Sequence, residues 1–439
     1  MDWATFGTLD ALRRIERLAW LAVCSNGDKN TGLVFGKVLF FRGCATILLL
    51  LVHASCFKTP SSGVDPQIAQ QIAAIKAIDN HAHPPRPDPA DKDFDALPVE
   101  MLEAQTDPVR LRPPGKPGLK LGPVETLDRA GIDRMIANRV SMGPGLPPER
   151  FLWVAYADAL MYPFATAVLE INPDRKAFFA LEAKLLERYY KESGVTARPA
   201  SLDEYLTRVV LATVDRHKQG GAIGEKFEMA YLRPLEIGNP GREEAEAAWR
   251  DGGRAAAAYR KLQDFIFRAI ATECGRLGMA VHFHTGAGAG GYFDFQGANP
   301  LLLQGLFNDP SLRKTNFVMV HGGWPFTREA GALLQKPNAY LDFSVQQFLR
   351  APSDLARTIR AWLELTPEKV MFGTDAYPYA PDAGLGWSDA TLIASEAGRE
   401  ALGRALTDMV REGTASRDRA GELAAMVLRE NARRLYGLK

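Results

Sequence analysis

Histidines at alternate positions are the most distinctive chemical feature of this sequence. His81 and His83 follow an apolar stretch and are separated by a single residue. If this stretch is a strand, both side chains lie on the same face, because strand side chains alternate with a period of two. Two imidazoles on one face can supply half of a metal site, since Zn²⁺ accepts histidine nitrogens as ligands. The pair alone is weak evidence, because strand histidines are more often structural.

Further candidate ligands lie at the ends of three later predicted strands, and a turn signal follows each strand. The first of these strands carries His282 and His284, the second His321 and the third Asp375. We favour His284 over His282 as the metal ligand, because it lies nearer the end of its strand; His282 then becomes a candidate substrate contact. Asp375 can bind the metal and also accept a proton from water. His321 can stabilise an oxyanion or transfer a proton.

The strands that carry these residues belong to a regular alternation of strands and helices. Alternation of this kind indicates a parallel sheet, and eight strands over roughly 370 residues indicate a (β/α)8 TIM barrel, with helical insertions after strands 1 and 3. The carboxyl ends of barrel strands share one mouth, so the candidate ligands converge there. A doubly wound sheet is the alternative fold. The predicted strands are 78–83, 132–140, 151–157, 221–229, 279–284, 316–321, 339–344 and 369–375.

Two cationic residues near the predicted fourth strand are candidates for substrate binding. Lys226 shares a strand face with Glu228, and a buried lysine without a partner is costly. Lys226 therefore meets a carboxylate, is modified, or binds an anionic substrate, and we favour pairing or substrate binding. Arg233, just beyond the strand, can bind a carboxylate through two hydrogen bonds; the alternative is a solvated loop arginine.

The composition indicates a folded, nearly neutral protein. The chain has 439 residues, is 46% hydrophobic, and carries 53 Lys plus Arg against 52 Asp plus Glu. This balance gives no support to nucleic-acid binding, which usually requires a basic excess. The four cysteines show no metal-binding spacing and predict no disulfide framework.

The first 65 residues differ from the rest of the chain. Basic residues precede an apolar run over 45–52, and Ala-Ser-Cys follows it, which is typical of a signal peptide. The triplet also resembles a bacterial lipobox with Cys56 as the lipidated residue, although His53 departs from the usual aliphatic residue. We therefore predict an N-terminal extension over 1–65 and a barrel domain over 66–439. Export to the periplasm or membrane attachment is favoured, and an ordinary cytoplasmic location is the alternative.

Four segments, in this order, resemble the amidohydrolase superfamily and specifically its amidohydrolase-related (family 2) branch: AIDNHAHP, VHFHTG, FVMVHGGWP and KVMFGTDAYP. These segments are most similar to those of nodulin- and fluffy-gene-like members, and the resemblance covers roughly residues 70–438. It implies a distorted TIM barrel that binds a divalent metal. It further implies a set of roles: metal ligands His81, His83, His284 and Asp375, with His321 as the catalytic histidine.

The resemblance also bears on the number of metals and on the reaction. Binuclear members of the superfamily carry a carbamylated lysine on the strand of Lys226, but the family 2 branch generally uses one metal, so we favour one Zn²⁺. We expect a metal-dependent hydrolase whose metal-bound hydroxide attacks a C–N or related bond of a small, carboxylate-bearing molecule. The alternatives are a non-oxidative decarboxylase of an aromatic or unsaturated acid, and a non-catalytic scaffold or sensor. Homodimers are common among such barrels.

Overall fold

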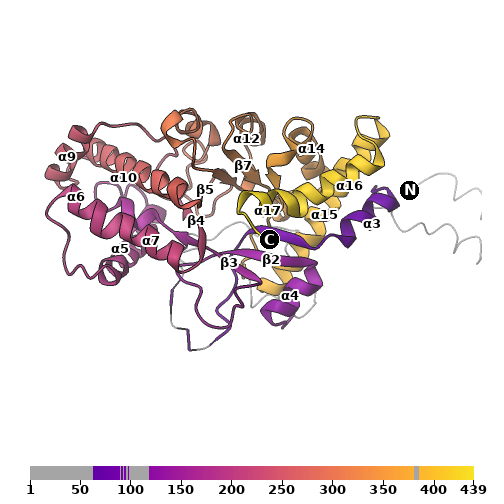
Figure 1. The fold of residues 1–439 in the computed structure, drawn as a ribbon, viewed down its shortest axis with the longest axis horizontal. Helices are drawn as coiled ribbons and strands as arrows, with labels where there is room; N and C mark the ends of the chain where they lie inside the picture. The colour runs from indigo at the N-terminus through magenta and orange to yellow at the C-terminus, as the bar shows by residue number, and fades with distance from the viewer. Residues whose placement is uncertain (1–62, 89, 92, 95–96, 98–117, 380–384) are drawn as a thin grey trace, which may run out of the picture. The chain divides into compact units, whose positions relative to one another are not determined.

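Eight parallel strands form the centre of the computed structural model, which describes residues 63–88, 90–91, 93–94, 97, 118–379 and 385–439. Each strand is hydrogen-bonded to the next in chain order. In Figure 1 the strands lie at the centre of the ribbon, with helices such as α10, α12 and α14 outside them. The strands are β1 Ala77–Ala82, β2 Ile132–Asn138, β3 Phe151–Tyr156, β4 Ala222–Phe227, β5 Ala280–His284, β6 Phe317–Val320, β7 Ala339–Asp342 and β8 Val370–Met371.

The ring closes between its first and last strands. β8 is short, but the residues after it continue beside β1. The backbone N–H of Asn80 donates to the carbonyl of Phe372 at 2.9 Å, and that of Asp375 donates to the carbonyl of His81 at 2.7 Å. These bonds confirm the predicted (β/α)8 barrel and place His81 beside Asp375 at the seam.

From β4 onward helices alternate with the strands, as predicted, whereas β3 follows β2 without a helix between them. Several helices begin at recognisable sequence signals. In α5, for example, the side chain of Asn172 accepts a hydrogen bond from the N–H of Arg175, and Pro173 occupies the first helical position. The α-helices are α3 Pro66–Ala74, α4 Pro123–Ala130, α5 Pro173–Glu192, α6 Leu202–Tyr205, α7 Ala212–Gln219, α8 Met229–Leu232, α9 Arg242–Asp251, α10 Ala256–Leu277, α11 Gln304–Phe307, α12 Thr327–Leu333, α13 Gln346–Leu349, α14 Pro352–Leu363, α15 Trp387–Arg411, α16 Arg417–Ala425 and α17 Asn431–Leu435.

The two predicted insertions differ in structure. Helices α5, α6 and α7 lie between β3 and β4, as predicted. Between β1 and α4, the described residues carry no helix. The candidate signal peptide and Cys56 lie outside the described residues. Within the described part of the chain, no helix has both the length and the apolar character needed to cross a bilayer.

The sequence suggests one long, alanine-rich helix over 243–275, and this prediction is wrong. The structure has two helices there, α9 and α10, separated at Gly252 and Gly253, whose φ angles are 71° and 75°. Left-handed backbone at a glycine ends a helix. At Gly253 a Cβ atom would lie 2.8 Å from Cβ of Phe164, so close packing also requires glycine.

The chain's C-terminal segment closes the amino-terminal end of the barrel. Apolar strand residues, among them Ile78, Val154 and Val318, form an inner cluster, and Tyr436 and Leu438 pack against it. Side chains therefore fill the amino-terminal end of the barrel. The candidate metal ligands lie at the opposite end, where the carboxyl ends of the parallel strands meet.

Candidate metal centre

The first three predicted ligands meet at the seam between β1 and β8. Nε2 of His81 lies 3.2 Å from Oδ1 of Asp375, and Nε2 of His83 lies 3.4 Å from the same oxygen. All three side chains are largely withdrawn from solvent. Asp375 has a φ of 56°, an uncommon angle for a residue other than glycine. The turn after β8 thus directs the carboxylate back toward both imidazoles.

His321 and His284 lie beside this group. One ligand atom each of His81, His321 and Asp375 lies within 4.8 Å of the other two, so these residues can hold one metal ion. Nε2 of His321 is in turn 3.2 Å from Nδ1 of His284. The structure therefore brings together all five residues that the sequence assigned to the metal centre, and it adds His321 to the possible ligands.

Two features fit a divalent metal at this position. The buried Nε2 atom of His81 has no hydrogen-bond partner, as expected of a nitrogen that offers its lone pair to an ion. Nε2 of His284 lies 2.5 Å from the carbonyl oxygen of Ala287, which can only accept, so that nitrogen carries a proton. Metal-binding histidines commonly donate their second N–H to a carbonyl in this way.

Burial and neighbouring charges set the protonation of the group. Burial, together with Lys226 and His83, holds the pKa of His81 well below its usual range. Burial likewise lowers the pKa of His321. Burial opposes ionisation of Asp375, but His321 and His83 outweigh it and lower the pKa of the carboxyl. Neutral imidazoles beside an ionised carboxylate are the forms that bind metal.

Lys226 meets a carboxylate, one of the three outcomes expected for it. Its ammonium contacts Oε1 of Glu228, and Oε2 of Glu228 lies 3.1 Å from Nδ1 of His284. Both members of the Lys226–Glu228 pair are buried. Burial would raise the pKa of Glu228, but Lys226 and His284 lower it well below its usual value. The ion pair favours the unmodified ammonium, because a carbamate would place a second negative charge beside Glu228.

Sequence reasoning placed Glu228 on a strand face but gave it no role at the metal centre. β4 ends at Phe227, and Glu228 precedes α8. Its backbone N–H donates to Oδ2 of Asp158 at 2.6 Å. Its position just past the end of β4 could have identified Glu228 as a site residue, because the other site residues also lie at or just past the ends of their strands.

His282 and Arg233, the other predicted substrate contacts, lie apart from the metal group. His282 is fully buried, and its Nε2 lies 2.8 Å from the hydroxyl of Tyr436, which packs at the amino-terminal end of the barrel. Arg233 donates to Oδ1 of Asp264 at 2.6 Å and to Oε1 of Gln263 at 3.0 Å. Burial, with Lys226 beside it, lowers the pKa of His282 to about 3. The substrate roles of both residues stay predictions.

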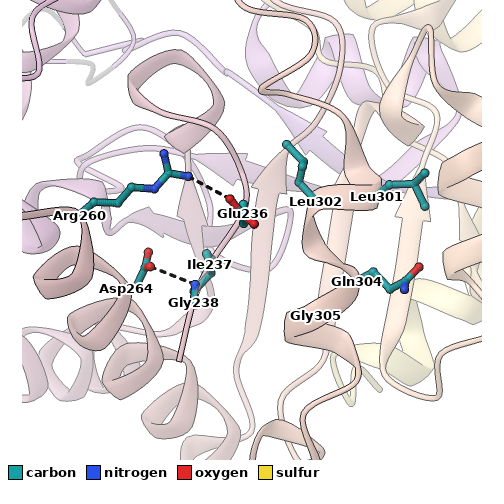
Figure 2. Close-up of a pocket in the computed structure, with 9 residues that line it drawn as sticks. All are labelled: Glu236, Ile237, Gly238, Arg260, Asp264, Leu301, Leu302, Gln304 and Gly305. Carbon is teal, nitrogen blue, oxygen red and sulfur yellow. Dashed lines mark hydrogen bonds and ion pairs between the residues drawn. The ribbon is translucent and has the colours of Figure 1, made fainter. Parts of the chain in front are cut away.

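A cavity of about 480 Å³ lies between α10 and the segment 301–305. Figure 2 shows Asp264, the partner of Arg233, on its wall beside Gly238, and Arg260 near Glu236. Its lining includes none of the five metal-centre residues. The cavity therefore lies apart from the metal centre, on the side of the barrel where Arg233 is anchored.

The sequence resembles a known protein family over most of its length. The model of the amidohydrolase family matches residues 78–438. Protein fluG of Emericella nidulans is 32% identical over 161 residues, which are 36% of this chain and 17% of that protein. The chain thus matches less than a fifth of this relative's length.

Solved structures show the same fold at low sequence identity. A protein assigned as a metal-dependent hydrolase from Lactobacillus casei superposes with a TM-score of 0.54 at 16% identity, over 72% of this chain and 78% of that one. A uronate isomerase from Thermotoga maritima gives 0.50 at 13% identity, over 71% and 69%. The family match over nearly all of the described barrel shows that the chain belongs to the amidohydrolase family.

Proposed function

We propose that this protein is a divalent-metal-dependent hydrolase that acts on a small molecule bearing a carboxylate. Membership of the amidohydrolase family implies a divalent metal, and His81, His321 and Asp375 form a group that can hold one. The convergence of this group with His83 and His284 at one end of the barrel is the observation that supports the proposal most strongly. A scaffold that binds no metal would have no need of five such side chains at one point.

The site residues have chemically distinct parts in this proposal. A bound divalent ion lowers the pKa of water to about 7 and polarises a carbonyl oxygen. Asp375, whose pKa is lowered by His321 and His83 despite burial, is ionised and can accept the proton of the attacking water. The hydroxyl of Tyr379 donates to the backbone carbonyl oxygen of Asp375 at 2.8 Å and lies 3.2 Å from Oδ2 of the same residue, so it packs beside the carboxylate. His321 directs its Nε2 toward the metal centre and can take up a proton there.

Lys226 is the candidate for holding the substrate carboxylate. A lysine ammonium has three donors, so its contact with Glu228 does not exhaust it. Its neighbours in the sheet register are Tyr156 on β3 and His282 on β5. The ammonium therefore lies inside the barrel, on the same strand end as the Glu228–His284 contact. This position, and not that of Arg233, favours Lys226 as the anion-binding group.

The proposal is tested by assaying the full-length protein on N-acyl amino acids and on cyclic amides and esters that carry a carboxylate, in ¹⁸O-labelled water. We expect hydrolysis with incorporation of one solvent oxygen, loss of activity on chelation, and recovery when Zn²⁺ or Mn²⁺ is returned. Asp354→Asn, at an exposed position on α14, serves as the control for Asp375→Asn. Activity that survives both chelation and Asp375→Asn would refute the proposal.

Two other results would replace it with one of the alternatives. Release of CO₂ from aromatic or unsaturated acids, without solvent oxygen in the product, would identify a decarboxylase. A purified protein that contains no metal, and takes up none on incubation, would identify a non-catalytic barrel.

A further inference from the structure

Buried neighbours hold His321 at its backbone and at Nδ1 of its ring. Its backbone N–H donates to Oδ1 of Asp342 at 3.0 Å, and its carbonyl accepts from the side-chain amide of Gln346 at 2.9 Å. In the ring, Nδ1 lies 2.9 Å from Oγ of Ser344, and Nε2 faces His284. All of these residues are buried. The imidazole therefore has one orientation available, and the segment after β7 determines it.

The direction of the hydrogen bonds around Asp342 follows from its surroundings. Oδ1 of Asp342 accepts from the backbone N–H of Ser344 at 3.0 Å, and Oδ2 accepts from the side-chain amide of Asn80 at 2.6 Å. Oγ of Ser344 lies 2.5 Å from Oδ1. A carboxylate only accepts, so the single hydroxyl proton of Ser344 points to Asp342. The serine oxygen must then accept from His321, which puts the proton of that ring on Nδ1.

On the other side of Asp342, the hydrogen bonds that come from the C-terminal segment also run toward its carboxylate. The hydroxyl of Tyr436 donates to Oδ1 of Asn80 at 2.6 Å and lies 2.8 Å from Nε2 of His282. A tyrosine hydroxyl has one proton, so Nε2–H of His282 donates to it. Two series of hydrogen bonds therefore run toward Asp342. In one, His282 donates to Tyr436, Tyr436 to Asn80 and Asn80 to Asp342; in the other, His321 donates to Ser344 and Ser344 to Asp342. A carboxylate that receives donors from both directions is fixed in place.

We propose that Asp342 and Ser344 are positioning residues for His321, which keep its proton on Nδ1 and present the Nε2 lone pair to the metal centre. The backbone supports this assignment. His321 and Val345, the residue after Ser344, have φ angles of 71° and 59°. Left-handed backbone is unfavourable for a β-branched residue, and such strain is retained where a site requires it. The effect on turnover rests on the proposed function, whereas the location of the proton does not.

The location of the proton is measured by NMR on full-length protein labelled with ¹⁵N-histidine, after chelation and again after addition of Zn²⁺. His321→Gln assigns the signals. After chelation we expect a pyrrole-like shift at Nδ1 of His321 and a pyridine-like shift at Nε2. Ser344→Ala removes the acceptor, so the proton should exchange between both nitrogens and give intermediate shifts. A wild-type ring protonated at Nε2, or shifts unchanged in Ser344→Ala, would overturn the proposal. The wild-type result decides even if the variant fails to fold.

Two control variants separate positioning from a general loss of packing. Ser395→Ala removes a buried hydroxyl on α15 that bonds the carbonyl of Ala130 and takes no part in the hydrogen bonds around His321; it should leave the His321 signals unchanged. Tyr436→Phe should shift the signals of His282 and leave His321 protonated at Nδ1. A change at His321 in the Ser395→Ala variant would refute the specific role of Ser344.

Turnover supplies the second readout. On a substrate found in the hydrolase assay, Ser344→Ala should lower kcat by roughly 10- to 100-fold, as is typical when the support of a metal-centre histidine is removed, with little change in KM. Ser395→Ala should retain wild-type kcat. An unchanged kcat in Ser344→Ala would overturn the catalytic part of the inference. If His321 carries its proton on Nδ1 but no substrate is hydrolysed, the proposed function fails and the positioning stands.

Discussion

A Lys226→Met substitution removes a buried ammonium and leaves its carboxylate partner in place. Lys226 and Glu228 have relative side-chain exposures of 0% and 2%, so water cannot replace the lost contact. Removing one partner of a buried ion pair costs about 3–5 kcal/mol, because the remaining charge is left unpaired. For a domain spanning Ser62–Lys439, the usual unfolding entropy per residue makes each kcal/mol worth a little over 1 °C. The melting temperature of the chelated protein should therefore fall by about 5 °C.

The double variant Lys226→Met/Glu228→Gln separates the ion pair from the packing of the lysine chain. It removes both charges, so its free energy of unfolding should return to within about 1 kcal/mol of wild type. Both variants are measured by urea and thermal unfolding after chelation, so that metal binding does not contribute. If Lys226→Met alone is as stable as wild type, Lys226 and Glu228 do not form a buried ion pair and the account of β4 is wrong. If the double variant is as unstable as the single one, the cost arises from packing.

Three further outcomes follow from other parts of the structure. Asp375→Asn should lower kcat by roughly 10²–10⁴-fold, the usual contribution of a general base, and reduce the metal content measured by elemental analysis; wild-type values of both would contradict its role. Arg399→Met should lower the free energy of unfolding by about 3 kcal/mol, because it removes three hydrogen bonds from a guanidinium to the carbonyls of Ile72, Ile75 and Gly131. Arg357→Met at an exposed position should change it by less than about 0.5 kcal/mol. Burial raises the pKa of the Cys274 thiol, so a thiol reagent should modify it only in urea; rapid reaction of the native protein would contradict this.

The barrel could be predicted from the sequence because its signals are local. Short apolar strands separated by helical segments recur along the chain, and each strand is recognisable within a few residues of its observed position. The grouping of His81, His284 and Asp375 followed from the topology alone, since the ends of parallel strands share one mouth. No distance was needed to expect that these side chains would meet.

The remaining parts of the site depend on contacts that leave no local pattern. Ser344 bonds His321 across 23 residues, and Tyr436 bonds His282 across 154. A serine after a strand and a tyrosine near the end of the chain have ordinary surroundings in the sequence. The predicted strand over 369–375 is longer than β8, because a positive φ at Asp375 turns the chain out of the ladder. Such backbone detail is set by packing and not by residue type.

The bond between Tyr436 and Asn80 joins residues that are 356 positions apart. Contacts of such large sequence separation form late, because closing a long loop costs chain entropy before the contact can compensate for it. Asn80 also bonds Asp342, 262 positions away, and Asp342 holds Ser344 beside His321. No contiguous half of the chain therefore contains all the residues that orient His321. Refolding followed in time should recover secondary structure first and the protonation of His321 at Nδ1 later, whereas the docking of Tyr436 sets the protonation of His282.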